Sequence, residues 1–134
     1  MNAALTPDQI LNNDFAKNHQ GREYTLDQAK QAFANHVARG GSVYQHTHSM
    51  FVLKPTTPGT VEFHSINGGT GQHLVQGVND MLTALKPHAH TAVTHFDNPK
   101  VVGLLKHSAH PHTVEQVNGG QDKTYRATFR LRGL

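Results

Sequence analysis

Apolar residues in this chain recur first with a helical period and then with a strand-like one. Between Leu26 and Val37 they are spaced three or four residues apart, which gathers them on one face of a helix. Thr25 and Gln28 form a capping box at the start of this helix, and two glycines after Arg39 end it. The pattern therefore predicts a helix over residues 26–39.

From residue 42 the period shortens to about two, which is typical of strands. We predict strands over residues 43–46, 50–53 and 60–66, with a turn rich in Pro and Gly before the third. A glycine-rich loop at residues 67–71 then precedes a helix over residues 72–85, whose apolar side chains share one face. The short connections favour antiparallel hairpins among these three strands.

Strand and helix alternate in the remaining third of the chain. The pattern predicts a strand over residues 90–96, a helix over 99–107, and two final strands over 113–117 and 123–131. In the last strand, alternate residues from Tyr125 to Leu131 are apolar and suit a core. The arginines between them suit a solvated face.

This order of elements predicts the fold class α/β (α+β), with a mixed sheet of about six strands and helices on both faces. The 134 residues are enough for one layered core and not for two, so we expect a single domain over residues 1–134. Residues 1–24 form an N-terminal extension with one short helix, which begins at Thr6 and ends near Asn13.

Composition limits the compartments and the binding partners that we expect for this chain. The chain has no cysteine, which excludes disulfides and thiolate metal sites, and we expect a reducing interior such as the cytoplasm. It has no apolar run of about 20 residues and no secretion-signal pattern, so we expect no membrane partner. The net charge of +3 is only mildly basic, and we expect no dedicated nucleic-acid role.

Twelve histidines are the unusual feature of this composition. Three His-x-His pairs, at residues 46–48, 88–90 and 110–112, have a spacing that can place two imidazoles on one metal ion. No carboxylate closely follows the first pair, and two of the pairs fall at predicted loop ends, where polar residues are expected. We therefore expect no metal site.

The strand, loop and helix at residues 60–85 form the strongest local arrangement for chemistry. Gly68, Gly69 and Gly71 would let backbone N–H groups turn toward a bound anion, and the start of the helix adds a partial positive charge. A diphosphate would suit such a site. The alternative is that these glycines only make a tight turn from strand to helix, because the loop is neither GxxxxGK[ST] nor a complete GxGxxG.

Three motifs of this chain occur together in a known family. They are the turn Gly69-Thr70-Gly71, the strand that ends Phe96-Asp97-Asn98, and the helix Asn98-Pro99-Lys100-Val101-Val102-Gly103-Leu104-Leu105. With the strands around them they resemble the acetyl-CoA-binding half of the GNAT N-acetyltransferases, and in topology the resemblance covers about residues 25–132. Residues 63–67 and 96–99 look most like short GNAT-type proteins of tailed bacteriophages.

The resemblance implies a GNAT-like fold, a coenzyme A thioester as acyl donor and an amine as acceptor. By the same resemblance, the acetyl-CoA site is formed by the loop residues Asn67, Gly68, Gly69, Thr70, Gly71 and Gln72, with Asn98 on the pantetheine arm. The alternative for Asn98 is a plain helix cap.

Acyl transfer to an amine needs a general base, for which His64 is the first candidate. Glu62 lies two residues earlier on the same predicted strand, so both side chains share one face near the expected opening between neighbouring parallel strands. An imidazole titrates near neutral pH and is better suited to this role than a carboxylate. The alternative is that His64 is a buried, hydrogen-bonded histidine, and His95, one strand over, is a further candidate.

Three departures from the family pattern keep a second function open. The usual Gln or Arg of the phosphate loop corresponds to Ile66, the Tyr that protonates the departing thiolate corresponds to Leu105, and a Gly-Phe pair corresponds to Ala109-His110. One hypothesis is an N-acyltransferase in the host cytoplasm. The other is a catalytically inert protein of the same fold, which serves as a structural or interaction component of a phage virion with protein assembly partners.

Overall fold

A computed structural model describes residues 4–18, 25–96, 100–119 and 122–131, and within these ranges the chain forms four helices and six strands. In chain order the elements are α1 (Pro7–Asn18), α2 (Leu26–Ala38), β1 (Ser42–Gln45), β2 (Ser49–Pro55), β3 (Thr60–Asn67), α3 (Gly71–Leu85), β4 (Thr91–Phe96), α4 (Lys100–Leu105), β5 (His112–Gly119) and β6 (Asp122–Arg130). The predicted fold class, a mixed six-stranded sheet with helices on both faces, is confirmed.

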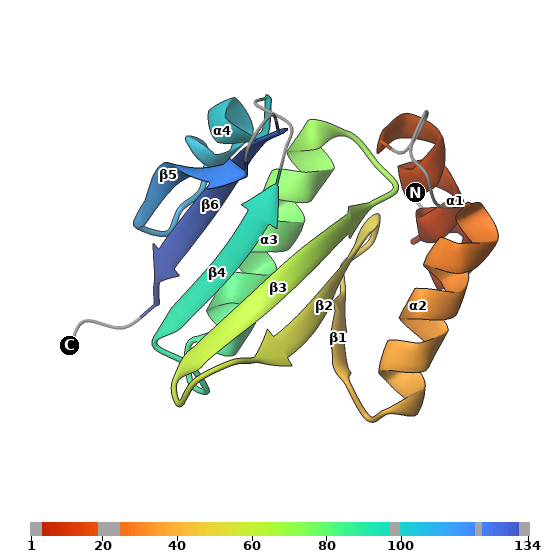
Figure 1. Cartoon of the computed structure of the whole chain (residues 1–134), viewed down its shortest axis with the longest axis horizontal. Helices are drawn as coiled ribbons and strands as arrows, with labels where there is room; N and C mark the ends of the chain where they lie inside the picture. The colour runs from red at the N-terminus through yellow and green to blue at the C-terminus, as the bar shows by residue number, and fades with distance from the viewer. Residues whose placement is uncertain (1–3, 19–24, 97–99, 120–121, 132–134) are drawn as a thin grey trace.

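The six strands form one sheet in the order β1-β2-β3-β4-β6-β5 (Figure 1). The first three pair as antiparallel neighbours, as their short connections predict. The crossover through α3 makes β4 parallel to β3, and β6 then pairs antiparallel with both β4 and β5. The parallel pair thus lies at the centre of the sheet, where α3 leaves one strand and returns to the other.

Two helix boundaries differ from the sequence prediction. Helix α1 continues to Asn18 instead of ending near Asn13, because its polar side chains bond to the loop after β3 and so hold residues that are weak helix formers. Helix α4 ends at Leu105 instead of His107. Its predicted caps, Asp97 and Asn98, lie outside the described residues.

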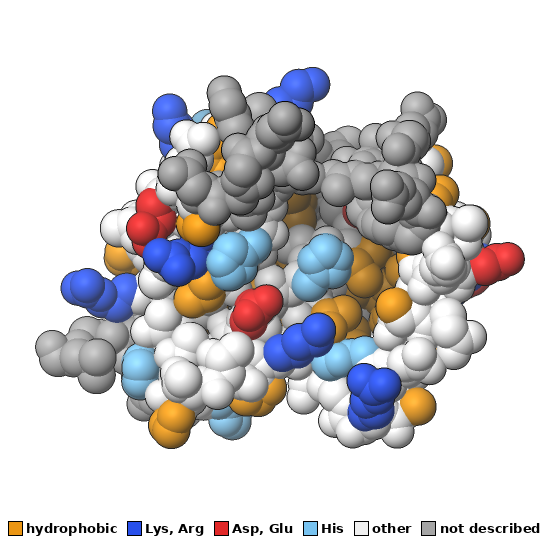
Figure 2. Space-filling model, in the orientation of Figure 1, with side chains coloured by type: hydrophobic (Ala, Val, Ile, Leu, Met, Phe, Trp, Pro, Cys, Tyr) orange, Lys and Arg blue, Asp and Glu red, His pale blue; other side chains and the backbone are white. Residues whose placement is uncertain are grey.

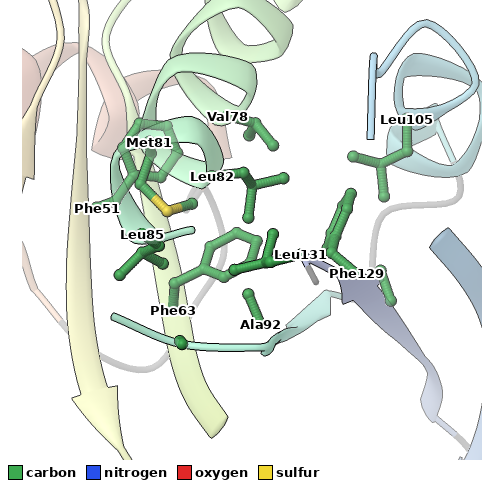
Figure 3. Close-up of a cluster of buried hydrophobic side chains, with 12 residues drawn as sticks. Phe51, Phe63, Val78, Met81, Leu82, Leu85, Ala92, Leu105, Phe129 and Leu131 are labelled. Atoms are coloured by element: carbon green, nitrogen blue, oxygen red, sulfur yellow. The ribbon is translucent and has the colours of Figure 1, made fainter. Parts of the chain in front are cut away.

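The main core lies between the sheet and α3, which Figure 1 shows behind β3 and β4. Its buried side chains, shown in Figure 3, are Phe51, Phe63, Val78, Met81, Leu82, Leu85, Ala89, Ala92, Leu105, Ala127, Phe129 and Leu131. Burying one large apolar side chain of this kind is worth about 1.5–3 kcal/mol. The apolar side of the last strand is part of this core, as its alternation predicts.

The opposite face of the sheet is covered by α1 and α2 over β1 to β3. A second cluster joins Ile10 of α1 to Met50 and Val52 of β2 and to Ile66 of β3. Helix α2 begins at the predicted capping box, in which Thr25 Oγ1 accepts the N–H of Gln28 at 3.2 Å. On the same face, Arg126 of β6 forms an ion pair with Glu115 of β5 at 2.9 Å. No helix in the described ranges is long and apolar enough to cross a membrane.

Candidate functional site

Strands β3 and β4 separate after only three parallel pairs. Thr60, Val61 and Glu62 pair with Thr91, Ala92 and Val93, and the described residues beyond them form no further pair between these strands. The last five residues of β3 and the last three of β4 therefore line an opening at the carboxyl end of the parallel pair. In open α/β sheets such an opening is where ligands bind. The splay that the sequence argument requires is confirmed.

His64 and His95 lie on the two sides of this opening. Each is two residues beyond the last paired residue of its strand, so both share the sheet face that carries Glu62 and Val93. Glu62, His64 and His95 are all exposed, and the alternative that His64 is a buried histidine is wrong. Figure 2 shows this face, with histidine, acidic and basic side chains gathered over the middle of the sheet.

The glycine loop continues from the end of β3, and the backbone N–H groups of its residues 68 to 70 already have acceptors. Gly68 donates to the His48 carbonyl at 2.8 Å, and Gly69 donates to Asn67 Oδ1 at 3.1 Å. Thr70 donates to His73 Nδ1 at 2.9 Å. Among the described residues, the N–H groups of Gly71 and Gln72 at the start of α3 have no hydrogen-bond acceptor. The loop therefore presents two open amides and two, at Gly69 and Thr70, that side chains cover.

The loop glycines are required by space and not by unusual backbone angles. Left-handed φ values occur, within the described chain, at Gly40 and Gly59 and not in this loop. A Cβ on Gly68 would lie 2.9 Å from the Cα of Ile10, and one on Gly69 would lie 2.8 Å from the Cβ of His48. The conformational freedom expected from the sequence is thus wrong as the reason for these glycines. They let α1 and the β1–β2 turn approach the loop closely.

Helix α1 supports the loop from the sheet face that α1 itself covers. Asp14 Oδ1 accepts the N–H of Asn67 at 3.0 Å, and Asn13 Nδ2 donates to the Gly68 carbonyl at 3.2 Å. Asp14 is buried, with 9% of its surface exposed. The N-terminal helix therefore fixes the position of the glycine loop.

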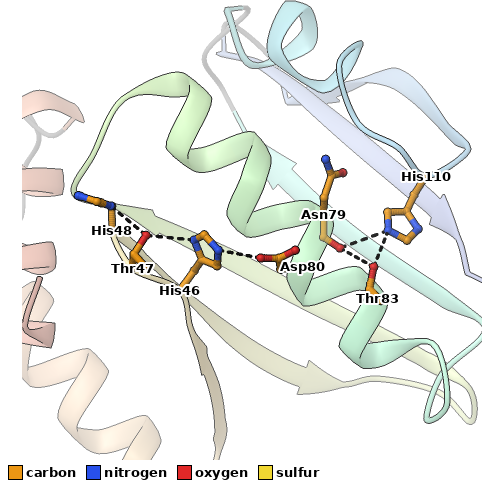
Figure 4. Close-up of polar contacts among 7 residues, drawn as sticks. All are labelled: His46, Thr47, His48, Asn79, Asp80, Thr83 and His110. Carbon is orange, nitrogen blue, oxygen red and sulfur yellow. Dashed lines mark hydrogen bonds and ion pairs between the residues drawn. The ribbon is translucent and has the colours of Figure 1, made fainter. Parts of the chain in front are cut away.

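A chain of polar contacts runs from α3 through the turn between β1 and β2 toward the loop (Figure 4). Asp80 Oδ2 lies 2.8 Å from His46 Nε2, Thr47 Oγ1 bridges to the rings of His46 and His48, and His48 stacks on His73 with ring centres 3.9 Å apart. Burial lowers the pKa of His48, and the neighbouring His73 and His46 lower it further. These contacts favour a neutral His48.

Sequence reasoning missed the role of His73. The signal is present, because Thr70-x-x-His73 has the spacing of a capping box. Histidine is not the usual Glu or Gln at the third position of such a box, so the sequence alone does not predict it here.

The histidines of the first and third His-x-His pairs are engaged in local contacts. His110 Nε2 lies 3.3 Å from Thr83 Oγ1 and 3.2 Å from the Asn79 carbonyl, and His112 Nδ1 lies 3.1 Å from the His110 carbonyl. Within the described ranges, no three His, Asp or Glu side chains converge as metal ligands.

Two of the residues that depart from the family pattern are buried. Leu105 is 4% exposed and points from α4 into the core beside Phe129 (Figure 3). Ile66 is 6% exposed and packs in the cluster with Ile10. Both positions therefore serve packing. Asn98, the predicted ligand of the pantetheine arm, lies outside the described residues.

No protein-family model and no curated protein matches this sequence. Solved structures do match it along nearly its whole length. A chimera of a Vibrio cholerae spermidine N-acetyltransferase with hSSAT is 16% identical, with a TM-score of 0.60 over 96% of this chain and 95% of that one. A Bacillus subtilis acetyltransferase in complex with CoA is 16% identical, with a TM-score of 0.54 over 96% and 95%.

A third similar structure is the Campylobacter jejuni N-acetyltransferase PseH in complex with acetyl coenzyme A. It is 14% identical, with a TM-score of 0.52 over 94% of this chain and 92% of that one. At these identities the likeness defines the fold. The chain has the fold of the GNAT acetyltransferases.

Proposed function

We propose that this protein transfers an acetyl group from acetyl-CoA to a primary amine. The single observation that carries the proposal is the parallel pairing of β3 and β4, which stops at Glu62 and Val93 and so leaves the end of β3, before the glycine loop, at an opening. Two of the structures with this fold are complexes with coenzyme A or acetyl coenzyme A, which supports the same cofactor here.

The diphosphate of the cofactor would bind at the start of α3. The open N–H groups of Gly71 and Gln72 and the positive end of the helix dipole suit an anion. For the N–H groups of Gly69 and Thr70 to join them, the side chains of Asn67 and His73 must turn away, since they now accept these hydrogen bonds. By resemblance, Asn98 would bind the pantetheine arm.

His64 is the proposed general base, at the edge of the opening between the strands. It takes a proton from the amine, the nitrogen attacks the thioester carbonyl, and the carbon–sulfur bond breaks as the amide forms. Glu62, exposed on the same face, would stabilise the resulting imidazolium. Leu105 has no proton to give to the departing sulfur. A thiol such as that of cysteine has a pKa of about 8.5, so the sulfur of the cofactor can leave as a thiolate and take its proton from solvent.

A calorimetric titration with acetyl-CoA tests this proposal. We expect the wild type to bind and Gly69→Glu to lose binding, because the new side chain fills the loop and repels the diphosphate. The matched control is Ala84→Glu, which adds the same charge at an exposed position in the last turns of α3. Absence of heat with the wild type at millimolar ligand would remove the proposal.

A second candidate function is a catalytically inert protein of this fold that acts as a structural or interaction component. Two observations favour it: side chains of the chain itself cover the amides of Gly69 and Thr70, and Leu105 fills the core. The kinship with phage proteins and a place in a virion remain predictions of the sequence. Mass spectrometry of a panel of amines incubated with the protein and acetyl-CoA tests it. Binding of acetyl-CoA without acetylation of any of these amines would favour this candidate.

A further inference from the structure

A groove of about 580 Å³ runs between α1, α2 and the sheet, and His64 is part of its wall. Its volume falls within the range of about 300–1,000 Å³ for small-molecule sites. Phe15 of α1, Phe33 of α2, and Val52 and Ile66 of the sheet give it a mainly apolar lining. Figure 2 shows a hollow with hydrophobic side chains beside the histidines of this face. The candidate base therefore faces an apolar space.

The groove is poorly suited to a polycation. Among the described residues that line it, Asp14 is the single carboxylate, and it is buried with its Oδ1 on the N–H of Asn67. Lys54 adds a positive charge to the lining, and the ring of His36 is held by the Ser42 carbonyl at 2.9 Å. Nothing described in the groove would compensate the several charges of a polyamine.

We infer that the acceptor is a primary monoamine on an apolar body, of which phenethylamine is a representative. This inference rests on the proposed function and names the substrate class of the same site. Burial of an ammonium group in an apolar groove without a free carboxylate lowers the pKa of the amine. The amine then reaches its neutral, nucleophilic form near neutral pH. One of its two N–H protons passes to His64 as the amide bond forms and the thioester carbon–sulfur bond breaks, and the other stays on the amide nitrogen.

Steady-state rates with two acceptors test the inference. We expect kcat/KM to be at least about tenfold higher for phenethylamine than for spermidine, because pocket complementarity commonly discriminates by this factor. Lys54→Glu should narrow that ratio, since it replaces the positive charge of the lining by a negative one. A higher kcat/KM for spermidine with the wild type would overturn the inference and leave the proposed function standing.

Two tryptophan variants of α2 test whether the groove holds the amine. Ala32 is exposed and lines the groove, so Ala32→Trp should fill it and weaken phenethylamine binding at least about tenfold. Ala38, exposed on the same helix and not part of the lining, gives the control Ala38→Trp. Binding is measured by saturation-transfer NMR without cofactor, and circular dichroism checks that both variants fold.

The binding experiment separates the two proposals. If acetyl-CoA does not bind, the proposed function fails, while phenethylamine binding that Ala32→Trp alone weakens still supports the groove as an apolar amine site. If phenethylamine binds equally to both variants, or binds to neither variant nor wild type, the groove is not the acceptor site and the inference fails.

Discussion

His73 and Thr70 cap the start of α3 reciprocally. His73 Nδ1 accepts the N–H of Thr70 at 2.9 Å, and Thr70 Oγ1 accepts the N–H of His73 at 3.2 Å. The helix end that would bind the cofactor is therefore already capped by two side chains of the chain itself.

Removing the hydroxyl of this cap should destabilise the protein. We expect Thr70→Ala to lower the free energy of unfolding by about 1 kcal/mol, as is typical for the loss of an N-cap oxygen. Thr57→Ala is the control, because Thr57 is exposed and uses its backbone carbonyl in the turn before β3. Urea denaturation measures both variants, and equal stabilities would show that the capping box contributes nothing.

The environment of His48 predicts a pH-dependent stability. Because burial, His73 and His46 lower the pKa of His48, the folded protein binds a proton here less readily than the unfolded chain does. The unfolded chain takes up this proton near pH 6.5, so stability falls as the pH drops through that value toward the lowered pKa.

Replacing His48 by a residue that does not titrate should weaken this dependence. We expect the stability of His48→Gln to change less between pH 7 and pH 5 than that of the wild type, as measured by urea denaturation. At pH 8 the side chain at this position is neutral in both proteins, and the difference in stability there reports the lost contacts of the His48 ring with Thr47 and His73. Parallel stability curves for the two proteins over the acidic range would contradict the prediction.

Catalysis should depend on His64 more than on His95. If His64 is the base, His64→Gln should lower kcat/KM by about 10²–10⁴ while leaving acetyl-CoA binding unchanged. His95→Gln is the matched control on the other side of the opening. Turnover that survives unchanged in His64→Gln eliminates this residue as the base.

Two glycine variants should change stability in opposite directions. A Cβ on Gly68 meets the backbone of Ile10, so Gly68→Ala should cost about 1–3 kcal/mol by pushing α1 from the loop. Gly103 of α4 is exposed with nothing within 4 Å, so Gly103→Ala should gain about 0.5–1 kcal/mol from better helix propensity. Thermal unfolding measures both, and a stable Gly68→Ala protein would mean that α1 packs less closely than described.

The sequence was sufficient for the elements whose signals are local. The capping box at Thr25, the alternation after Tyr125, and the change of period at residue 42 each depend on neighbours a few positions away, and each prediction is confirmed. The parallel crossover also follows, because a strand, a helix and a second strand in this order leave few other arrangements.

Features that depend on distant partners could not be predicted in this way. Helix α1 extends past Asn13 through bonds to a loop more than fifty residues later. The stacking of the His48 ring on that of His73 joins two segments far apart in the sequence, and no spacing along the chain encodes that contact. The assignments of His64 and Glu62 to catalysis remain predictions.

Asp14 belongs to two places at once, since it lines the groove and holds the N–H of Asn67. If α1 moved when an amine entered the groove, this carboxylate would transmit the movement to Asn67, at the start of the glycine loop. Linkage then requires that each ligand alter the affinity for the other by the same factor. If the proposed function holds, one buried side chain would therefore couple the binding of the amine to that of the cofactor.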